Sequence, residues 1–362
     1  MMSKKKKQEN NLEVTFLKGL GIIAVVLGHT HAPNLVPIIY YWHLPLFFFI
    51  IGLTYNPEKY EKRVSHLMAS RLHSFFPMYF CYMIILGLLH NTFYAMGILP
   101  HTQILYDIQT GLNAFWNYFH LIAEPFGGPL WFMFPYFYAT LIYGVLVSVG
   151  TLIQSDWKKR QPFIIVVCIL CACIGFMCVE YGIVRNDFAD IALVIMPIVA
   201  AGGVYRSFRK ELLCFINKGG FVIGSMLILG AHFRFNAWII LDQRKYIGFI
   251  QFYLLAFSGI YCCLYLAHIL EGYKEKRVCI WICKIGNYSM DIMTLHFLFF
   301  KLVDFYYSKC VVMDNNFVLS QFPHSLYSGW SVLVYTVVGI CGPIFMRKTL
   351  DIFFCKMVTV HK

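Results

Sequence analysis

The feature that most constrains this chain is a series of long apolar segments, which recur from Phe16 to Phe354 with only short polar interruptions. Hydrophobic residues make up 59% of the 362 residues and charged residues only 13%, whereas a typical soluble domain has about 45–50% and about 25%. A soluble fold has too little interior to bury so much apolar surface. Because helices satisfy their own backbone hydrogen bonds in hydrocarbon, we predict an all-α, polytopic integral membrane protein.

About ten segments approach the roughly 20 residues that a helix needs to cross a bilayer. We expect spans at approximately 14–32, 38–56, 74–95, 129–150, 162–181, 188–205, 219–240, 246–270, 288–307 and 327–346. The seventh carries Arg234, Asn236 and Asp242 in its outer half, which also fits a short span followed by an interfacial segment. The expected organisation is a basic tail at 1–13, one transmembrane domain at 14–346 and a second tail at 347–362.

The net charge of +12 suggests nucleic-acid binding as one possible function, but the positions of the basic residues argue against this function. They gather before the first expected span, where Lys4 to Lys7 lie, and after the second, fourth, sixth, eighth and tenth spans. Such alternation is the positive-inside pattern. We therefore expect a multi-pass cell-membrane protein with both termini in the cytoplasm and no nucleic-acid partner. The stretch 96–128, with Trp116 and Phe119, is then expected on the opposite side, near lipid headgroups.

Two other interpretations of the composition are less favoured. The N-terminal lysines resemble the charged region of a signal peptide, but Lys18 interrupts the apolar run and no small-x-small cleavage pattern follows. The 13 cysteines do not form a disulfide framework, because only Cys310 falls in an expected extracytoplasmic loop. Cys279 and Cys283 lack a second ligand pair nearby, so we expect no metal site.

Lys18 and His29 form the first chemical constellation. Ten residues separate them in a run that is otherwise apolar or glycine, so three helical turns place both on nearly the same face, roughly 16 Å apart. An ionisable group within a span is a candidate for function. The alternative is that Lys18 snorkels to the interface and His29 lies at the rim.

A returning segment brings a further histidine to the same membrane face. It begins at His43 and contains Pro45, and the loop before it carries His31. Histidine titrates near neutrality and is the commonest general base. A cluster of His29, His31 and His43 could also hold a metal, but no carboxylate or cysteine accompanies them. We favour acid–base chemistry.

At these residues the chain resembles a known family. The motif Lys18-x10-His29, which ends in Val25-Val26-Leu27-Gly28-His29, and the motif His43-Leu44-Pro45-Leu46-Phe47-Phe48-Phe49 resemble the opening of the integral-membrane acyltransferase 3 family, particularly its fucose 4-O-acetylase-like branch. Three later pieces are similar to family motifs in the same order: the basic segment from Arg63 through Arg71 to Pro77, Gly128-Pro129-Leu130-Trp131-Phe132, and Ile285-Gly286-Asn287-Tyr288-Ser289 with His296. The order makes the combination specific.

Two positions depart from the family pattern. The family usually has an acidic residue where this chain has Thr15, and Glu13 lies two residues earlier. A serine usually precedes the glycine that ends the phenylalanine run, where this chain has Ile51. Both departures concern substrate placement or helix packing around the site rather than His29 itself.

The resemblance implies an O-acyltransferase that moves an acyl group, with acetyl as the expected group, from acyl-CoA to the hydroxyl of a sugar or cell-surface polysaccharide. A lipid-linked sugar is an alternative acceptor, and the acceptor class stays open. It assigns the general base to His29 and coenzyme binding to Lys18, with Arg63 and Arg71 as candidates for the nucleotide end. A hydroxyl is a poor nucleophile near neutral pH, so a base must take its proton.

The remaining motif residues are expected on the substrate side. They are His43, Trp131, Asn287, Ser289 and His296. Polar and aromatic residues between spans also serve as packing contacts, so each has a structural alternative. A different class of function also stays open at this point: Lys18, Asp291 and His296 could form the proton relay of a transporter for a polar solute. The absence of an internal repeat counts against that alternative.

Overall fold

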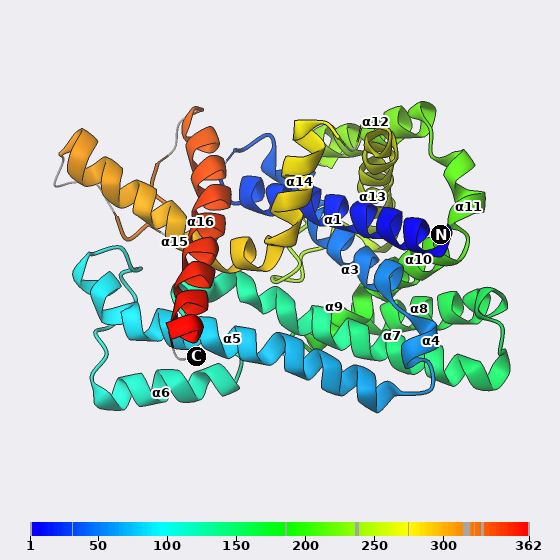
Figure 1. Ribbon diagram of the computed structural model, residues 1–362, viewed down its shortest axis with the longest axis horizontal. Coiled ribbons are helices and arrows are strands. Elements are labelled where there is room, and N and C mark those ends of the chain that lie inside the picture. The colour runs from blue at the N-terminus through cyan, green and yellow to red at the C-terminus, as the bar shows by residue number, and fades with distance from the viewer. Residues whose placement is uncertain are drawn as a thin grey trace. The chain divides into compact units, whose positions relative to one another are not determined.

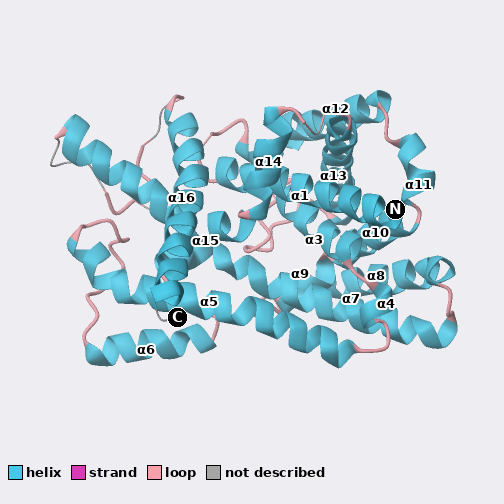
Figure 2. Ribbon diagram, in the orientation of Figure 1, coloured by secondary structure: helices cyan, strands magenta, loops and turns pink. Residues whose placement is uncertain are grey.

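The structure is a computed structural model that describes residues 2–30, 32–184, 187–235, 239–273, 275–313, 319–321, 323–326 and 329–360. It is 79% helical and has no strand within these ranges (Figure 2). His31 and Asn236 lie outside the described residues. The expectation of an all-helical protein is therefore confirmed, as the ribbon in Figure 1 shows.

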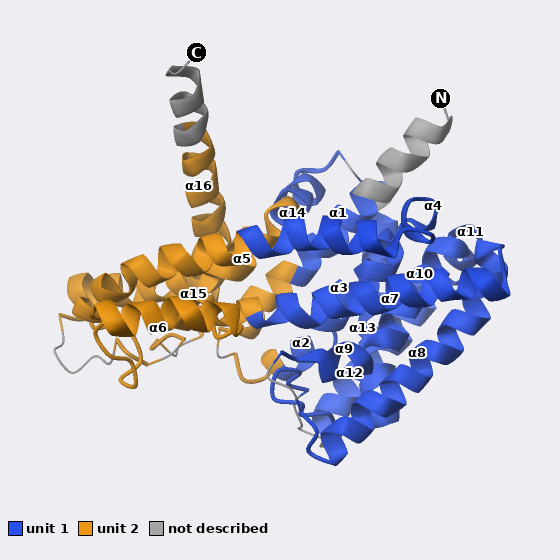
Figure 3. Ribbon diagram, turned by 90° about the horizontal axis from the view of Figure 1, so that it is seen from below, with its two compact units in different colours: residues 1–21, 37–77, 131–286 blue, residues 22–36, 78–130, 287–362 orange. Residues whose placement is uncertain are grey.

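The chain divides into two compact units, coloured in Figure 3. Unit 1 comprises residues 1–21, 37–77 and 131–286, and unit 2 comprises residues 22–36, 78–130 and 287–362. Helices α1 (Met2–Gly28) and α5 (Val64–Ala95) contribute residues to both units.

Unit 1 holds most of the helices. They are α2 (Val36–Tyr40), α3 (His43–Thr54), α4 (Pro57–Tyr60), α7 (Met133–Ile153), α8 (Trp157–Glu180), α9 (Ala189–Val194), α10 (Met196–Ser207), α11 (Arg209–Leu212), the 3-10 turn η2 (Leu213–Phe215), α12 (Lys218–Phe235), α13 (Phe249–Glu271) and α14 (Arg277–Asn287). Unit 2 contains α6 (Ile108–Phe119), most of the 3-10 segment η1 (Pro125–Phe132), α15 (Ser289–Tyr306), the π-helical η3 (Tyr307–Val312) and α16 (Ser331–Val360).

Six helices of the described chain are long and apolar enough to cross a membrane. They are Val36–Thr54, Val64–Ala95, Pro125–Ile153, Trp157–Glu180, Phe249–Leu270 and Ser331–Ile352. A seventh arises if Arg209–Phe215 and Lys218–Arg234, which meet at a bend of 75°, form one broken span. The protein is thus an integral membrane protein, whereas the expected count of ten is not confirmed.

Three expected spans lie outside this set: 14–32, which overlaps α1, and 188–205 and 288–307. The segment 188–205 is divided at Ile195 into α9 and α10, just before Pro197, whose ring disfavours a continuous helix. The segment 288–307 forms α15, but this helix carries Asp291, Lys301 and Asp304.

Those charges are satisfied inside unit 2. Lys301 Nζ lies 3.0 Å from Asp304 Oδ2, with both side chains fully buried, and it donates to the carbonyls of Leu319 and Gln321. Tyr335 of α16 donates its hydroxyl to Asp304. A buried charge is costly unless it is paired and hydrogen-bonded, so this network is what allows α15 to be buried against α16.

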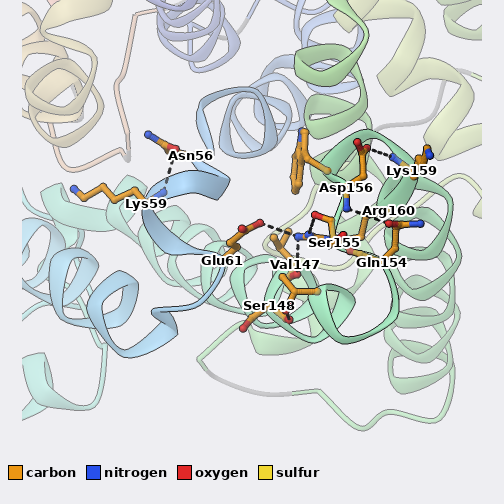
Figure 4. A network of polar contacts seen from close by, with 12 residues as sticks. Asn56, Lys59, Glu61, Val147, Ser148, Gln154, Ser155, Asp156, Lys159 and Arg160 are labelled. Carbon is orange, nitrogen blue, oxygen red and sulfur yellow. Dashed lines mark hydrogen bonds and ion pairs between the residues drawn. The ribbon is translucent and has the colours of Figure 1, made fainter.

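A buried arginine organises one end of unit 1 (Figure 4). The Arg160 side chain is 1% exposed, and its Nη1 lies 3.0 Å from Glu61 Oε2. It also donates to the carbonyls of Gln154 and Ser155, each at 2.7 Å. Arg160 belongs to one of the basic clusters that follow an expected span, yet here it joins the turn between α7 and α8 to the segment before α5.

Candidate functional site

The expected base, His29, directly follows the last residue of α1 and is half-buried. In unit 2 its Nδ1 lies 3.2 Å from Nε2 of His296, which is fully buried in α15. The two ring centroids are 5.1 Å apart. The structure thus brings together two histidines that are 267 positions apart in the sequence.

Hydrogen bonds to backbone carbonyls fix the tautomers of this histidine pair. A carbonyl can only accept, so His296 Nδ1, 2.9 Å from the Ile292 oxygen, carries a proton. In the neutral ring, His296 Nε2 therefore accepts from His29. His29 Nδ1 is also 2.9 Å from the Val25 oxygen, so its N–H is shared between the carbonyl and His296. Neutral His29 then carries its lone pair on Nε2, the nitrogen a general base requires.

Aromatic packing holds the histidine pair. The Phe297 ring meets the His29 ring edge-on with centroids 4.9 Å apart, and it lies 4.6 Å from the His296 ring. A Cβ added at Gly128 would be 3.7 Å from Phe297, so a side chain at the first residue of the Gly-Pro-Leu-Trp-Phe motif would contact the ring that packs on both histidines. Phe297 was not predicted as a site residue, because none of the motifs quoted above includes it.

A carboxylate lies on the same helix as His296. Tyr82 donates its hydroxyl to Asp291 Oδ1 at 2.6 Å, and Arg347 Nη1 lies 3.8 Å from the same oxygen. Asp291, the carboxylate of the transporter alternative, is therefore held by a phenol and a cation within unit 2.

The expected donor-binding residues lie in unit 1. Lys18 is half-buried in α1, and the positive charge of Arg71 acts on it. Arg71 is half-buried in α5, and its Nε has no hydrogen-bond partner among the described residues. Arg63 is exposed just before the start of α5. The structure therefore brings Lys18 and Arg71 close enough for their charges to interact, and places Arg63 two turns before Arg71.

The helix that carries Lys18 is crossed closely by α14. A Cβ added at Gly286 would lie 2.0 Å from the Thr15 carbonyl oxygen, and one added at Gly19 would lie 2.2 Å from the Ile282 oxygen. The two glycines thus allow the backbones to meet, which is a packing reason for the Ile-Gly-Asn motif. Glu13, the acidic residue displaced from the family position, bonds Tyr205 at 2.8 Å and Arg209 at 3.1 Å.

The other expected site residues are dispersed. His43 is buried in unit 1, and its Nδ1 donates to the Ile39 oxygen at 2.8 Å. Trp131 packs on Phe188 with ring centroids 5.2 Å apart. Asn287 is exposed at the end of α14, and Ser289 is half-buried at the start of α15. Within the described residues, no three metal-ligand side chains converge.

A second histidine cluster in unit 2 was missed by the sequence interpretation. His90 Nδ1 lies 3.0 Å from Glu124 Oε2, with the side chains 0% and 3% exposed. Tyr118 and Tyr106 donate to the other carboxylate oxygen at 2.5 and 3.2 Å. His90 Nε2 donates to the Ile104 carbonyl at 2.9 Å. Only an isolated histidine at the end of one expected span and an isolated glutamate in the next loop could have signalled this cluster.

Comparison with known proteins gives one match. The family model described as an acyltransferase domain matches residues 11–347. No curated protein and no solved structure matches the chain. The match covers both histidines of the pair, Lys18, Arg63 and Arg71.

Proposed function

Because the chain belongs to the acyltransferase domain family, we propose that this integral membrane protein transfers an acetyl group from acetyl-CoA to the hydroxyl of a sugar in a cell-surface polysaccharide or its precursor. The choice of acetyl and sugar rests on the resemblance of the Lys18-x10-His29 and His43-to-Phe49 motifs to the fucose 4-O-acetylase-like branch. Family membership also argues against the transporter alternative.

The observation that carries the proposal is the contact between His29 and His296. Its hydrogen-bond pattern directs the Nδ1–H of His29 to Val25 and His296, so the basic nitrogen is Nε2. We assign the general base to Nε2 of His29. His296, which we expected to orient the acceptor, instead serves as a positioning residue that fixes the tautomer of His29.

The reaction then needs one proton transfer in each direction. His29 takes the proton of the acceptor hydroxyl as its oxygen attacks the thioester carbonyl carbon. The carbon–sulfur bond breaks, and the coenzyme A thiolate leaves with the proton that His29 has taken. When His29 becomes an imidazolium, its Nδ1–H still donates to His296, so the partner supports both charge states.

Lys18 and Arg71 are the proposed donor contacts. Two cations whose charges repel are stabilised when an anion neutralises them, and acyl-CoA offers phosphates and pantetheine oxygens. The guanidinium of Arg71 suits a phosphate because its donors form a planar fork. Arg63, which is exposed, is proposed for the nucleotide end.

The acceptor side is proposed from motif positions. His43, Trp131, Asn287 and Ser289 carry polar or aromatic groups that suit hydroxyls and sugar faces. The basic residues gather in alternate loops, which is the pattern of cytoplasmic loops in a membrane protein. This pattern supports a cell-membrane location with both termini, 1–13 and 347–362, in the cytoplasm.

The test is mass spectrometry of host surface glycans with and without the gene. We expect an increment of one acetyl group in cells that carry the wild-type gene, and its loss in cells that carry only His29→Ala. The exposed His120 provides the control, since His120→Ala should retain the increment. An unchanged glycan profile on deletion would contradict a sugar acceptor.

A further inference from the structure

Helix α6 in unit 2 exposes an uncharged apolar face. Its sequence from Ile108 to Phe119 contains no Asp, Glu, Lys or Arg. The exposed apolar residues, which we call the α6 apolar face, recur at helical spacing: Ile108 (85% exposed), Leu112 (60%), Phe115 (43%), Trp116 (64%) and Phe119 (51%). The amides Gln109, Asn113 and Asn117 form a separate exposed stripe. A continuous apolar face of this size requires a partner.

The packing of α6 shows where that partner must lie. The Asn91 side chain pairs with the backbone of Tyr106 through two hydrogen bonds of 2.8 Å. At the other end, the rings of Phe80 and Phe119 are 4.8 Å apart. Tyr106 therefore contacts α5 at Asn91, and Phe119 contacts it at Phe80. These two positions on α5 are about 16 Å apart along the helix axis, and their order is opposite to that of Tyr106 and Phe119. Helix α6 runs antiparallel beside α5 (Figure 1).

The neighbouring surface of α5 is itself apolar and exposed. Helix α5 is long and apolar enough to cross a membrane. In the part that belongs to unit 2, it exposes Ile84 (40%), Leu88 (78%) and Leu89 (39%). The α6 apolar face thus continues a surface that a membrane-crossing helix must present to lipid.

The two acidic groups that flank α6 are hydrogen-bonded within unit 2, which lowers the cost of placing them near lipid. The Asp107 carboxylate accepts from the Thr110 backbone N–H and hydroxyl, at 2.8 and 2.7 Å, and caps the start of α6. Glu124, after the end of α6, is bonded by His90, Tyr118 and Tyr106.

We propose that α6 is a re-entrant helix whose apolar face binds the acyl chains of membrane lipids, in the leaflet that the C-terminal half of α5 crosses. The stretch 96–128, expected from the sequence to be an extramembrane loop, then turns back into the bilayer along α5. The proposal does not depend on the acyl-transfer chemistry.

The test places a photoreactive benzophenone amino acid at position 112 or 116 of the full chain in native membranes. After irradiation, mass spectrometry of the corresponding peptide should show phospholipid adducts at both positions. The matched controls are positions 109 and 113 on the amide stripe of the same helix, where we expect at least severalfold fewer lipid adducts.

Adducts to another protein chain at 112 and 116, or equal lipid adducts on both stripes, would overturn the proposal. A second measurement avoids foreign side chains. In proteoliposomes, the tryptophan fluorescence of Trp116 is the difference between the wild type and the Trp116→Phe variant. Lipids brominated on their acyl chains should quench this difference. Lack of quenching of that component would place Trp116 outside the acyl region.

Discussion

Two histidines of unit 2 contrast in how their nitrogens are used. Both nitrogens of His90 are engaged inside the fold, Nδ1 with the Glu124 carboxylate and Nε2 with the Ile104 carbonyl. The bonds of His29 to Val25 and His296 both go to Nδ1. These bonds place the N–H of neutral His29 on Nδ1 and leave the basic lone pair on Nε2, whereas both nitrogens of His90 face oxygen acceptors.

The partners differ as well. Glu124 carries two tyrosine hydroxyls in addition to His90, so the cluster is a closed set of polar groups around one carboxylate. His296 is a second imidazole, which can accept the Nδ1–H of His29 in either charge state of that ring. Burial and proximity to an acid therefore do not identify the base. The direction of the lone pair does.

The largest expected effect is on His29. His29→Ala should lower the acyl-transfer rate by about 10²–10⁴-fold, the usual contribution of a general base, while the protein still inserts and unfolds at a normal temperature. The measurement is the turnover of acetyl-CoA by purified protein with host glycan. The wild-type rate should also decline at acid pH, because a protonated imidazole cannot take the hydroxyl proton. A near-normal rate in His29→Ala would move the base elsewhere.

His90 should show the opposite pattern. His90→Ala leaves Glu124 buried without its imidazole, and breaking a buried pair in this way costs about 3–5 kcal/mol. We expect a marked drop in the thermal unfolding temperature in detergent, with an unchanged rate per folded molecule. His120→Ala, at an exposed histidine, is the matched control. A large loss of rate in a stable His90→Ala protein would break the contrast between the two histidines.

His296 should fall between these extremes. His296→Ala removes one hydrogen bond to the base, worth about 0.5–1.5 kcal/mol, and we expect kcat to fall about tenfold with an unchanged KM for acetyl-CoA. His296→Gln should restore part of kcat, because its amide oxygen can accept the Nδ1–H. Equal rates in the two variants would reduce His296 to a packing role.

The smallest expected effect concerns the donor. Lys18→Ala should raise the KM for acetyl-CoA about fivefold, since a partly exposed charge contact is worth at most about 1 kcal/mol. Lys18→Arg should retain much of the affinity because the charge survives. If Lys18→Ala binds acetyl-CoA as the wild type does, Lys18 only snorkels to the interface.

Sequence reasoning predicted the membrane-embedded helical class and the family because both rest on local signals. Apolar length is visible residue by residue, and the Lys18-x10-His29 motif lies on one helix. The motif that ends at His296 also predicted this residue as part of the site. A motif does not indicate which residue lies next to it in space, so the contact between His296 and His29 could not be predicted. The assignment of His296 to the acceptor was made without knowing which ring it faces.

The cluster of His90 and Glu124 could not be predicted for the same reason. Thirty-four positions separate the two residues, and the stretch 96–128 between them was expected to be an extracytoplasmic loop near the lipid headgroups. Helix α6 is short and uncharged, so neither its length nor its charge revealed that it packs back along α5. Long-range contacts of this kind depend on how helices meet, which no local pattern encodes.

The charges of α15 bear on how the chain is synthesised. A buried charge is costly unless it is paired and hydrogen-bonded, and α15 leaves the ribosome with Lys301 and Asp304 before Tyr335 exists. Its acid gains that hydroxyl only when α16 follows. We therefore expect α15 and α16 to pack together as one hairpin, and a chain terminated before Ser331 should lose the packing of the helix that carries His296.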